Sequence, residues 1–197
     1  MKKPNLSSNF KRFMMEMLPV ILGVLIAFMI NNWNENYKSE KKFNLAKAHI
    51  IQEIKSNKGE CEKILKVQEK RNEFYRIYRD SLNKFQSKKL SFAQLPFEGI
   101  NVPSISRTAW DAANTSGVTS DFSFEELQML TAIYEMQEIL DDVQKQIISN
   151  VYSNSMYSPE SLKATFNSLN RLNTDYLDFI KGISNAYNTY LNKFSEK

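Results

Sequence analysis

An uninterrupted apolar run at residues 17–30 is the first feature of the hydrophobic pattern. Glu16 precedes it, and a pair of asparagines follows it. Extended back to residue 13, the run contains Glu16 as its only polar residue and approaches the roughly 20 residues that a membrane-spanning helix needs. The pattern predicts a transmembrane anchor over 13–33, preceded by a basic tail over 1–12.

Two other structures fit a short apolar run of this kind, a cleaved signal peptide and a buried core helix. No small-x-small cleavage motif follows the run. Trp33 and Tyr37 come directly after it, where aromatic side chains anchor a helix at the level of the lipid headgroups. The sequence therefore favours an uncleaved anchor in the lipid bilayer, with Trp33 and Tyr37 as its interfacial anchors.

The rest of the chain shows helical periodicity and no alternation of β-branched residues. A long helix is predicted over 36–86. A loop follows over 87–106, because Pro96, Gly99 and Pro103 interrupt the helical pattern there. With only five glycines and five prolines in 197 residues, the chain is expected to be all-α.

Two further helices are predicted from their end signals. A short helix over 107–116 ends before Gly117, the residue type that favours a left-handed cap. A second helix over 123–151 begins with a capping box, in which Ser123 and Glu126 each bond a main-chain N–H of the first turn. Its apolar residues recur at spacings of three and four, which predicts this buried stripe: Met129, Ile133, Met136, Leu140, Val143 and Ile147.

The last predicted helix, over 158–195, has the strongest periodicity. Its seam alternates steps of four and three and comprises Leu162, Phe166, Leu169, Asn173, Tyr176, Ile180, Ile183, Tyr187, Tyr190 and Phe194. Asn173 occupies an a position of this heptad pattern, where a buried polar residue can fix coiled-coil register; alternatively, it bonds a neighbouring helix of the same chain. The predicted architecture is an anchor, a long helix and an elongated antiparallel helical bundle or coiled coil.

Charge is unevenly distributed along this +4 chain. Lys and Arg predominate over 38–89, whereas acidic residues predominate over 121–145. We expect the two helices to pair through these charges. Lipid headgroups are an alternative partner for the basic helix, whereas its interleaved acidic residues argue against nucleic acid.

The sequence shows no pattern typical of a catalytic, cofactor or metal site. His49 is the only histidine and has no Cys or His at ligand spacing. Cys61 falls on an apolar stripe with Ile50, Ile54, Asn57 and Ile64, which predicts a core residue. We therefore expect a protein that is not an enzyme and holds no cofactor or metal.

Three residues of the anchor suggest more specific roles. Glu16 is an ionisable group at the start of a spanning helix; it either reaches the headgroups or forms an ion site with a polytopic partner. Gly23 and Ala27, four residues apart, would let two anchors pack closely, although such pairs are frequent by chance. Lysine and arginine in the tail over 1–12 favour a cytoplasmic N-terminus.

Glu16, Gly23 to Ala27 and the run Asn32-Trp33-Asn34-Glu35 resemble the pattern of a bacterial family of uncharacterised single-pass membrane proteins. In that family an acidic residue, a Gly-x-x-Ile-Ala core and an Asn-Trp-Asn-Glu exit precede a long helix. Residues 110–135, with Ser116-Gly117, resemble a second, looser pattern of such proteins. The resemblance implies helical architecture and single-pass topology in a bacterial membrane. Together with the charge bias of the tail, it leads us to expect the inner membrane as the location and an extracytoplasmic domain over 34–197.

The expected function is that of a membrane-anchored structural or interaction protein, a scaffold or an accessory subunit. Its partner would be further copies of the chain or a polytopic membrane protein. Two alternatives stay open: an ion-driven complex that uses Glu16, and sensing of a ligand outside the cytoplasm through a polar pocket.

Overall fold

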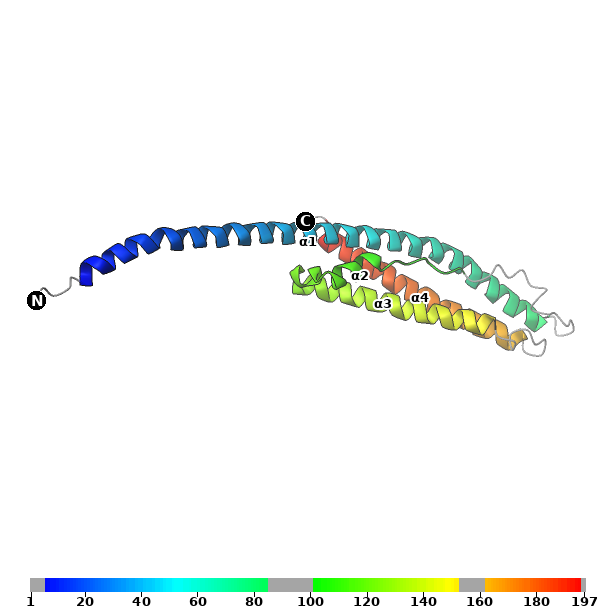
Figure 1. Cartoon of the computed structure of the whole chain (residues 1–197). Coiled ribbons are helices and arrows are strands. Elements are labelled where there is room, and N and C mark those ends of the chain that lie inside the picture. Colours follow the sequence, from blue (N-terminus) through cyan, green and yellow to red (C-terminus); the bar gives the residue numbers. More distant parts are fainter. Residues whose placement is uncertain (1–5, 85–100, 153–161, 196–197) are drawn as a thin grey trace, which may run out of the picture. The chain divides into compact units, whose positions relative to one another are not determined.

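The computed structural model describes residues 6–84, 101–152 and 162–195. Within these ranges the regular structure is helical, and no strand occurs in them (Figure 1). The chain is therefore an all-helical protein with a long apolar N-terminal helix, as the sequence predicts.

The first helix, α1 (Leu6–Lys84), is continuous through the predicted anchor and most of the predicted long helix. Pro19 lies inside it and has no N–H to donate to the preceding turn. At the expected junction, Asn31 Nδ2 donates a 3.0 Å hydrogen bond to Glu35, one turn further on. Most of the predicted loop over 87–106 lies outside the described residues.

The chain divides into two compact units, which we describe separately: unit 1, residues Met1–Leu45, and unit 2, residues Ala46–Lys197. In unit 1, every side chain described between residues 12 and 42 is exposed. The sequence placed the start of the outer domain at residue 34, whereas the compact unit begins at Ala46.

Unit 2 contains the second half of α1 and three further α-helices. These are α2 (Thr108–Thr115), α3 (Phe124–Val151) and α4 (Leu162–Phe194), with a 3-10 helix η2 (Val118–Asp121) between α2 and α3. Gly117 joins α2 to η2 with a φ of 75°, the left-handed conformation that glycine adopts at little cost. The first residues of the predicted helix over 158–195 lie outside the described ranges.

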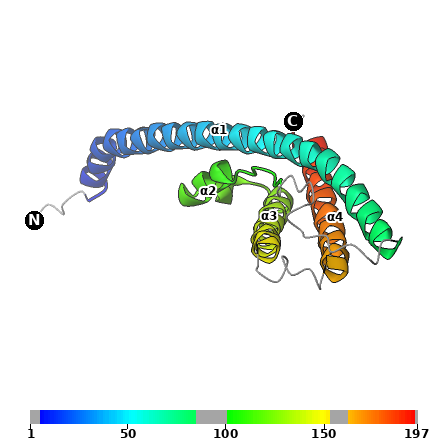
Figure 2. The ribbon, with the colours of Figure 1, turned by 90° about the vertical axis from the view of Figure 1, so that its right-hand side faces the viewer.

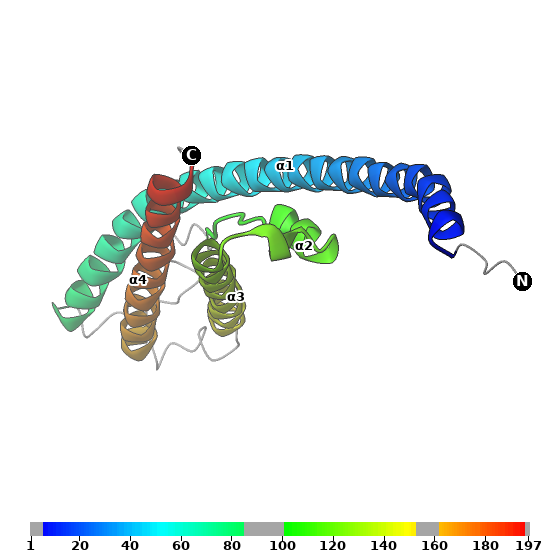
Figure 3. The ribbon, with the colours of Figure 1, turned by 90° about the vertical axis from the view of Figure 1, so that its left-hand side faces the viewer.

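The hydrogen bonds of unit 2 set the directions of its long helices, of which α3 and α4 lie side by side in Figures 2 and 3. Lys47 and Glu53 of α1 bond residues near the start of α3, in the same order along both helices, so α1 and α3 run parallel. Asn173 near the described start of α4 bonds Gln68 late in α1. Thus α4 runs antiparallel to α1. Its hydrogen bonds to α3 show that α4 also runs antiparallel to α3.

A non-helical segment, residues 101–107, makes the parallel course of α1 and α3 possible. It returns along α1, because Asn101 is bonded by Gln68 and Ser106 by Asn57. The expectation of an antiparallel bundle is therefore wrong for α1 and α3, since the chain retraces α1 in this segment before α3 begins.

The core of unit 2 includes one heptad seam on each long helix. On α4, the seam from Asn173 to Phe194 is buried as predicted; the side chains of its first three predicted positions lie outside the described ones. On α1, Ile50, Ile54, Asn57 and Cys61 are buried, whereas Ile64 is half-buried.

The seam of α3 differs from the predicted stripe. Met129, Met136 and Val143 are only half-buried. Apart from Tyr134, the buried positions repeat at steps of four and three: Glu126, Leu130, Ile133, Gln137, Leu140, Gln144 and Ile147. The prediction is confirmed for Ile133, Leu140 and Ile147 and wrong for the other three positions, because it counted only apolar side chains, whereas this seam includes three polar ones.

Candidate functional site

The interior of unit 2 contains an unusual number of polar side chains for a core between helices. The buried polar residues are Asn57, Gln68, Glu126, Gln137, Gln144, Asn173 and Ser184. A buried polar group without a hydrogen-bond partner destabilises the folded state. The hydrogen-bond partners of these side chains therefore matter for the stability of unit 2.

Two glutamines of α3 each bond a tyrosine of α4. Gln137 Nε2 donates a 2.9 Å hydrogen bond to the Tyr187 hydroxyl, and Gln144 Nε2 donates a 3.1 Å bond to that of Tyr176. Burial raises the pKa of both tyrosines above the ordinary value. These pairs fix the register of α3 against α4, because a shift of one helical position would leave the buried amides unpaired.

Glu126 joins three helices at the end of the interior where α3 begins. Lys47 Nζ lies 3.0 Å from each of its carboxylate oxygens. The Tyr190 hydroxyl donates a 3.0 Å bond to the same carboxylate. Burial and the charge of Glu126 raise the pKa of Tyr190.

The predicted capping box is therefore only half formed. The Glu126 N–H donates a 3.2 Å bond to Ser123 Oγ, as expected of a helix cap. The Glu126 side chain, however, contacts Lys47 and Tyr190, since these groups satisfy a buried carboxylate better than one main-chain N–H would.

Glu53 connects α1 to α2 and α3. One of its oxygens accepts a 2.8 Å bond from the Tyr134 hydroxyl, and the other accepts bonds from Ser106 Oγ (2.8 Å) and the Ala109 N–H (2.9 Å). Burial, and then the bond to Glu53, raise the pKa of Tyr134. The Trp110 ring stacks on the Tyr134 ring at 4.9 Å between centroids.

Side-chain amides of α1 hold the main chain of segment 101–107. Asn57 Nδ2 donates a 2.7 Å bond to the Ser106 carbonyl, and its Oδ1 accepts a 2.9 Å bond from the Ser106 N–H. Gln68 Nε2 donates a 2.7 Å bond to the Asn101 carbonyl.

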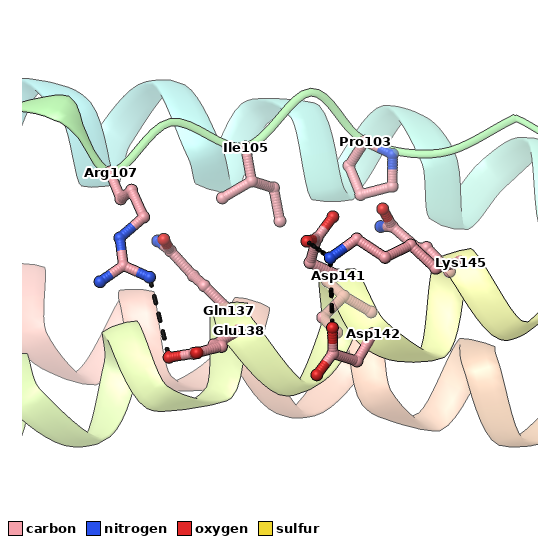
Figure 4. A pocket seen from close by; sticks show the side chains of 10 residues that line it. Pro103, Ile105, Arg107, Gln137, Glu138, Asp141, Asp142 and Lys145 are labelled. Carbon is pink, nitrogen blue, oxygen red and sulfur yellow. Dashed lines mark hydrogen bonds and ion pairs between the residues drawn. The ribbon is translucent and has the colours of Figure 1, made fainter.

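A groove of about 360 Å³ lies between segment 101–107 and α3 (Figure 4). Pro103 and Ile105 line one side, and Gln137, Leu140 and Gln144 line the other. Charged side chains on the rim form two groups: Arg107 with Glu138 at 3.8 Å, and Lys145 with Asp141 and Asp142 at 2.7 and 3.2 Å.

Other candidate chemistry is sparse in the part of the chain that the structure describes. Its His, Cys, Asp and Glu residues form no group of three able to hold a metal ion. His49 is exposed. Burial raises the pKa of the Cys61 thiol to about 12, so the thiol is a core group and a poor nucleophile at neutral pH.

The anchor residues singled out from the sequence are dispersed along an exposed helix. Glu16 forms an ion pair with Arg12, one turn before it, at 3.2 Å. Trp33 and Tyr37 are 72% and 61% exposed. A side chain in place of Gly23 would meet nothing within 4 Å, and Ala27 is exposed.

Asn173 is buried and donates a 3.2 Å bond to the main-chain carbonyl of Gln68. Its partner is thus a neighbouring helix of the same chain. This is the second of the two alternatives for Asn173, the first being to fix the register of a coiled coil. Sequence reasoning missed Glu53, Ser106, Gln137 and Gln144. Only the heptad spacing of the two glutamines could have indicated their burial.

The predicted charge pairing of α1 with α3 consists, among the described residues, of the single ion pair Lys47–Glu126. Glu69 of α1 instead pairs with Lys181 of α4 at 3.5 Å. Glu125 of α3 pairs with Lys193 of α4.

Comparison with known proteins adds one match. Residues 16–159 match the profile of DUF6090, described as a family of unknown function. The chain belongs to DUF6090. No curated protein and no solved structure matches the chain.

The DUF6090 match begins at Glu16 and includes the apolar run, segment 101–107 and all of α3. It ends before the described part of α4. Both walls of the groove therefore lie within the family region, whereas the tyrosines that bond Gln137 and Gln144 lie beyond it.

Proposed function

We propose that this DUF6090 protein is a single-pass membrane protein whose helical unit 2 binds protein, as a scaffold or accessory subunit and without catalysis. The anchor would span the bacterial inner membrane, with the N-terminus in the cytoplasm and unit 2 outside. Its partner would be a second copy or a polytopic membrane protein.

The observation that carries the proposal is the exposure of the apolar run. Among the described residues, α1 is the one helix long and apolar enough to cross a bilayer, and none of its most apolar window is buried. Leu22, Leu25 and Phe28 are 49%, 52% and 62% exposed. A contiguous apolar surface of this kind is unfavourable in water and favourable in lipid.

The flanks of the run support the same proposal. The Arg12–Glu16 ion pair gives Glu16 a local partner at the level expected for headgroups, which favours that role over an ion site. Exposed Trp33 and Tyr37 follow the run, as aromatic anchors do at a membrane interface.

The hydrogen bonds of the buried polar side chains support an interaction role for unit 2. Its buried polar groups bond to partners on the other helices of unit 2, so they specify one arrangement of α1, α3 and α4 rather than presenting reactive groups to a substrate. A rigid helical surface with exposed charges is a suitable platform for a protein partner.

Membrane insertion is tested with the full-length protein carrying a C-terminal tag in a bacterial host. We expect wild-type protein to remain in the membrane pellet after alkaline carbonate extraction. The double variant Leu22→Arg/Leu25→Arg should be released, because each charge at the centre of a bilayer costs about 2.5–3.5 kcal/mol. Leu45→Arg, outside the run, is the matched control and should stay in the pellet.

Two further measurements complete this test. The intact mass should include Met1, whereas a mass that lacks the run would show a cleaved signal peptide and overturn the anchor. Protease added to spheroplasts should remove the C-terminal tag; a protected tag would reverse the proposed orientation.

The interaction role is tested by light scattering on the protein extracted in mild detergent, with mass spectrometry of co-eluting proteins. A homo-oligomer or a stoichiometric polytopic partner is the expected result. A monomer that co-elutes with nothing stoichiometric would contradict the scaffold proposal.

A further inference from the structure

Two buried glutamines of α3 line the groove between this helix and segment 101–107, and each uses only its amide nitrogen in a described hydrogen bond. Gln137 and Gln144 are 6% and 8% exposed, and both line the groove. Each donates through Nε2 to a tyrosine, whereas neither amide oxygen accepts a hydrogen bond from any residue that the structure describes.

The charges on the rim add to this excess of acceptors. Three carboxylates, Glu138, Asp141 and Asp142, face two cations, Arg107 and Lys145, so the lining has a net charge of −1 (Figure 4). The Arg107–Glu138 contact is loose, at 3.8 Å, and both groups are exposed. A ligand that fits this lining must therefore be positively charged and rich in N–H donors.

The arrangement along the groove specifies the shape of such a ligand. Gln137 and Gln144 are two helical turns apart, about 10 Å along the axis at 1.5 Å per residue. Leu140 lies between them in the sequence of α3 and also lines the groove. Pro103 and Ile105 lie across the groove from α3 (Figure 4). Acceptors at both ends and apolar groups in the middle fit a chain of methylenes with an ammonium at each end.

We propose that this groove binds a linear aliphatic polyamine. Its terminal ammonium groups bond the amide oxygens of Gln137 and Gln144 and the carboxylates beside them, and its methylenes contact Leu140 and Ile105. Lys145 lies 2.7 Å from Asp141 and so competes with the ligand for the same carboxylate. The proposal concerns unit 2 alone and does not depend on membrane insertion.

The test is calorimetric titration of the full-length protein in non-ionic detergent at low salt, with spermidine as the probe. We expect saturable binding to one site, retained by 1,5-diaminopentane and lost with n-pentylamine, which has only one amine. Penta-lysine peptide is expected to bind more weakly, because its peptide main chain, with a side chain on every residue, is too wide to fit between Ile105 and Leu140. Tighter binding of penta-lysine would overturn a free polyamine in favour of a protein ligand.

Three variants and one control make the test specific. Glu138→Gln and Asp142→Asn should each weaken spermidine binding about threefold, the effect of an exposed ion pair. Lys145→Met should tighten it by a similar factor. Glu135→Gln removes an exposed carboxylate of α3 that does not line the groove, and it should have no effect.

Several outcomes would overturn the polyamine site. These are the absence of saturable heat, equal displacement by MgCl₂ at matched ionic strength, and equal weakening by Glu135→Gln. Binding of glutarate in place of spermidine would show that the groove selects anions.

Discussion

The side-chain amide of Asn57 pairs with both main-chain polar groups of Ser106, 49 residues further along the chain. The two hydrogen bonds join a side chain of α1 to the main chain of a segment without regular structure. They fasten the return of the chain along α1 and so position the start of α2.

Replacing Asn57 with alanine should destabilise unit 2 by about 1–3 kcal/mol, because the Ser106 N–H and carbonyl lose their partners. Chemical unfolding of the full-length protein in detergent, followed by circular dichroism, measures the change. Asn185→Ala is the control, an exposed asparagine of α4, and it should change stability by less than about 0.5 kcal/mol. Equal effects of the two substitutions would show that the Asn57–Ser106 pair is not stabilising.

Lys47 and Glu126 should be strongly coupled, because the Lys47 side chain is 18% exposed and that of Glu126 only 4%. Lys47→Met leaves a buried carboxylate with too few donors and is expected to cost about 3 kcal/mol. In the double variant with Glu126→Gln, much of this loss should be recovered. The same cycle on the exposed pair Lys193–Glu125 should give a coupling below about 1 kcal/mol; equal coupling in the two pairs would contradict the effect of burial.

Alkaline pH should unfold unit 2 cooperatively. Burial raises the pKa of Tyr134, Tyr176, Tyr187 and Tyr190, so each binds its proton more tightly in the folded protein than in the unfolded one. Their contribution to stability is complete below the ordinary tyrosine pKa, about 10, and is lost as pH rises above it. Each tyrosine should lower the free energy of unfolding by up to about 1.4 kcal/mol per pH unit.

The measurement is tyrosinate absorbance against helical circular dichroism between pH 9 and pH 13. Ionisation of the four buried tyrosines should coincide with loss of the helical signal. Tyr134→Phe should reduce the pH slope by one proton. Tyrosinate formation at all four positions in a still-folded protein would contradict the prediction.

Cys61 should resist alkylation in the folded protein. Its thiol is fully buried, and burial raises its pKa to about 12, so almost no thiolate is present at pH 8. Iodoacetamide should label it at the rate at which unit 2 unfolds, and rapidly in guanidinium chloride. Fast labelling without denaturant would show that the α1 seam opens locally.

The sequence predicted the features that depend on local pattern. The helical class, the cap of α3 at Ser123 and the α4 seam all follow from spacing and cap chemistry along one stretch of chain. The α3 seam could not be predicted in this way, because Gln137 is buried only where Tyr187, 50 residues away, supplies its partner. The same holds for Asn173, whose partner is 105 residues away in α1.

Charge composition was a poor guide to helix pairing for a related reason. Most carboxylates of α3 point to solvent, where an ion pair contributes little, and the pair that joins α1 to α3 depends on the burial of one glutamate. The groove depends on segment 101–107, which has no periodic pattern to identify it.

The return of the chain along α1 also determines the order in which the interior can form during synthesis. α1 leaves the ribosome first, yet the asparagine that bonds Gln68 is 105 residues further on. At about 5–20 residues per second, the part of the α1 seam that α4 covers stays open for roughly 5 to 20 s. α3 and α4 are neighbours in sequence and can associate as soon as both are made. The first helix synthesised is therefore the last to be fully covered. A chain truncated before α4 would leave the α4-facing part of α1 around Gln68 open to aggregation, although segment 101–107 and α3 could already bond Asn57 and Glu53.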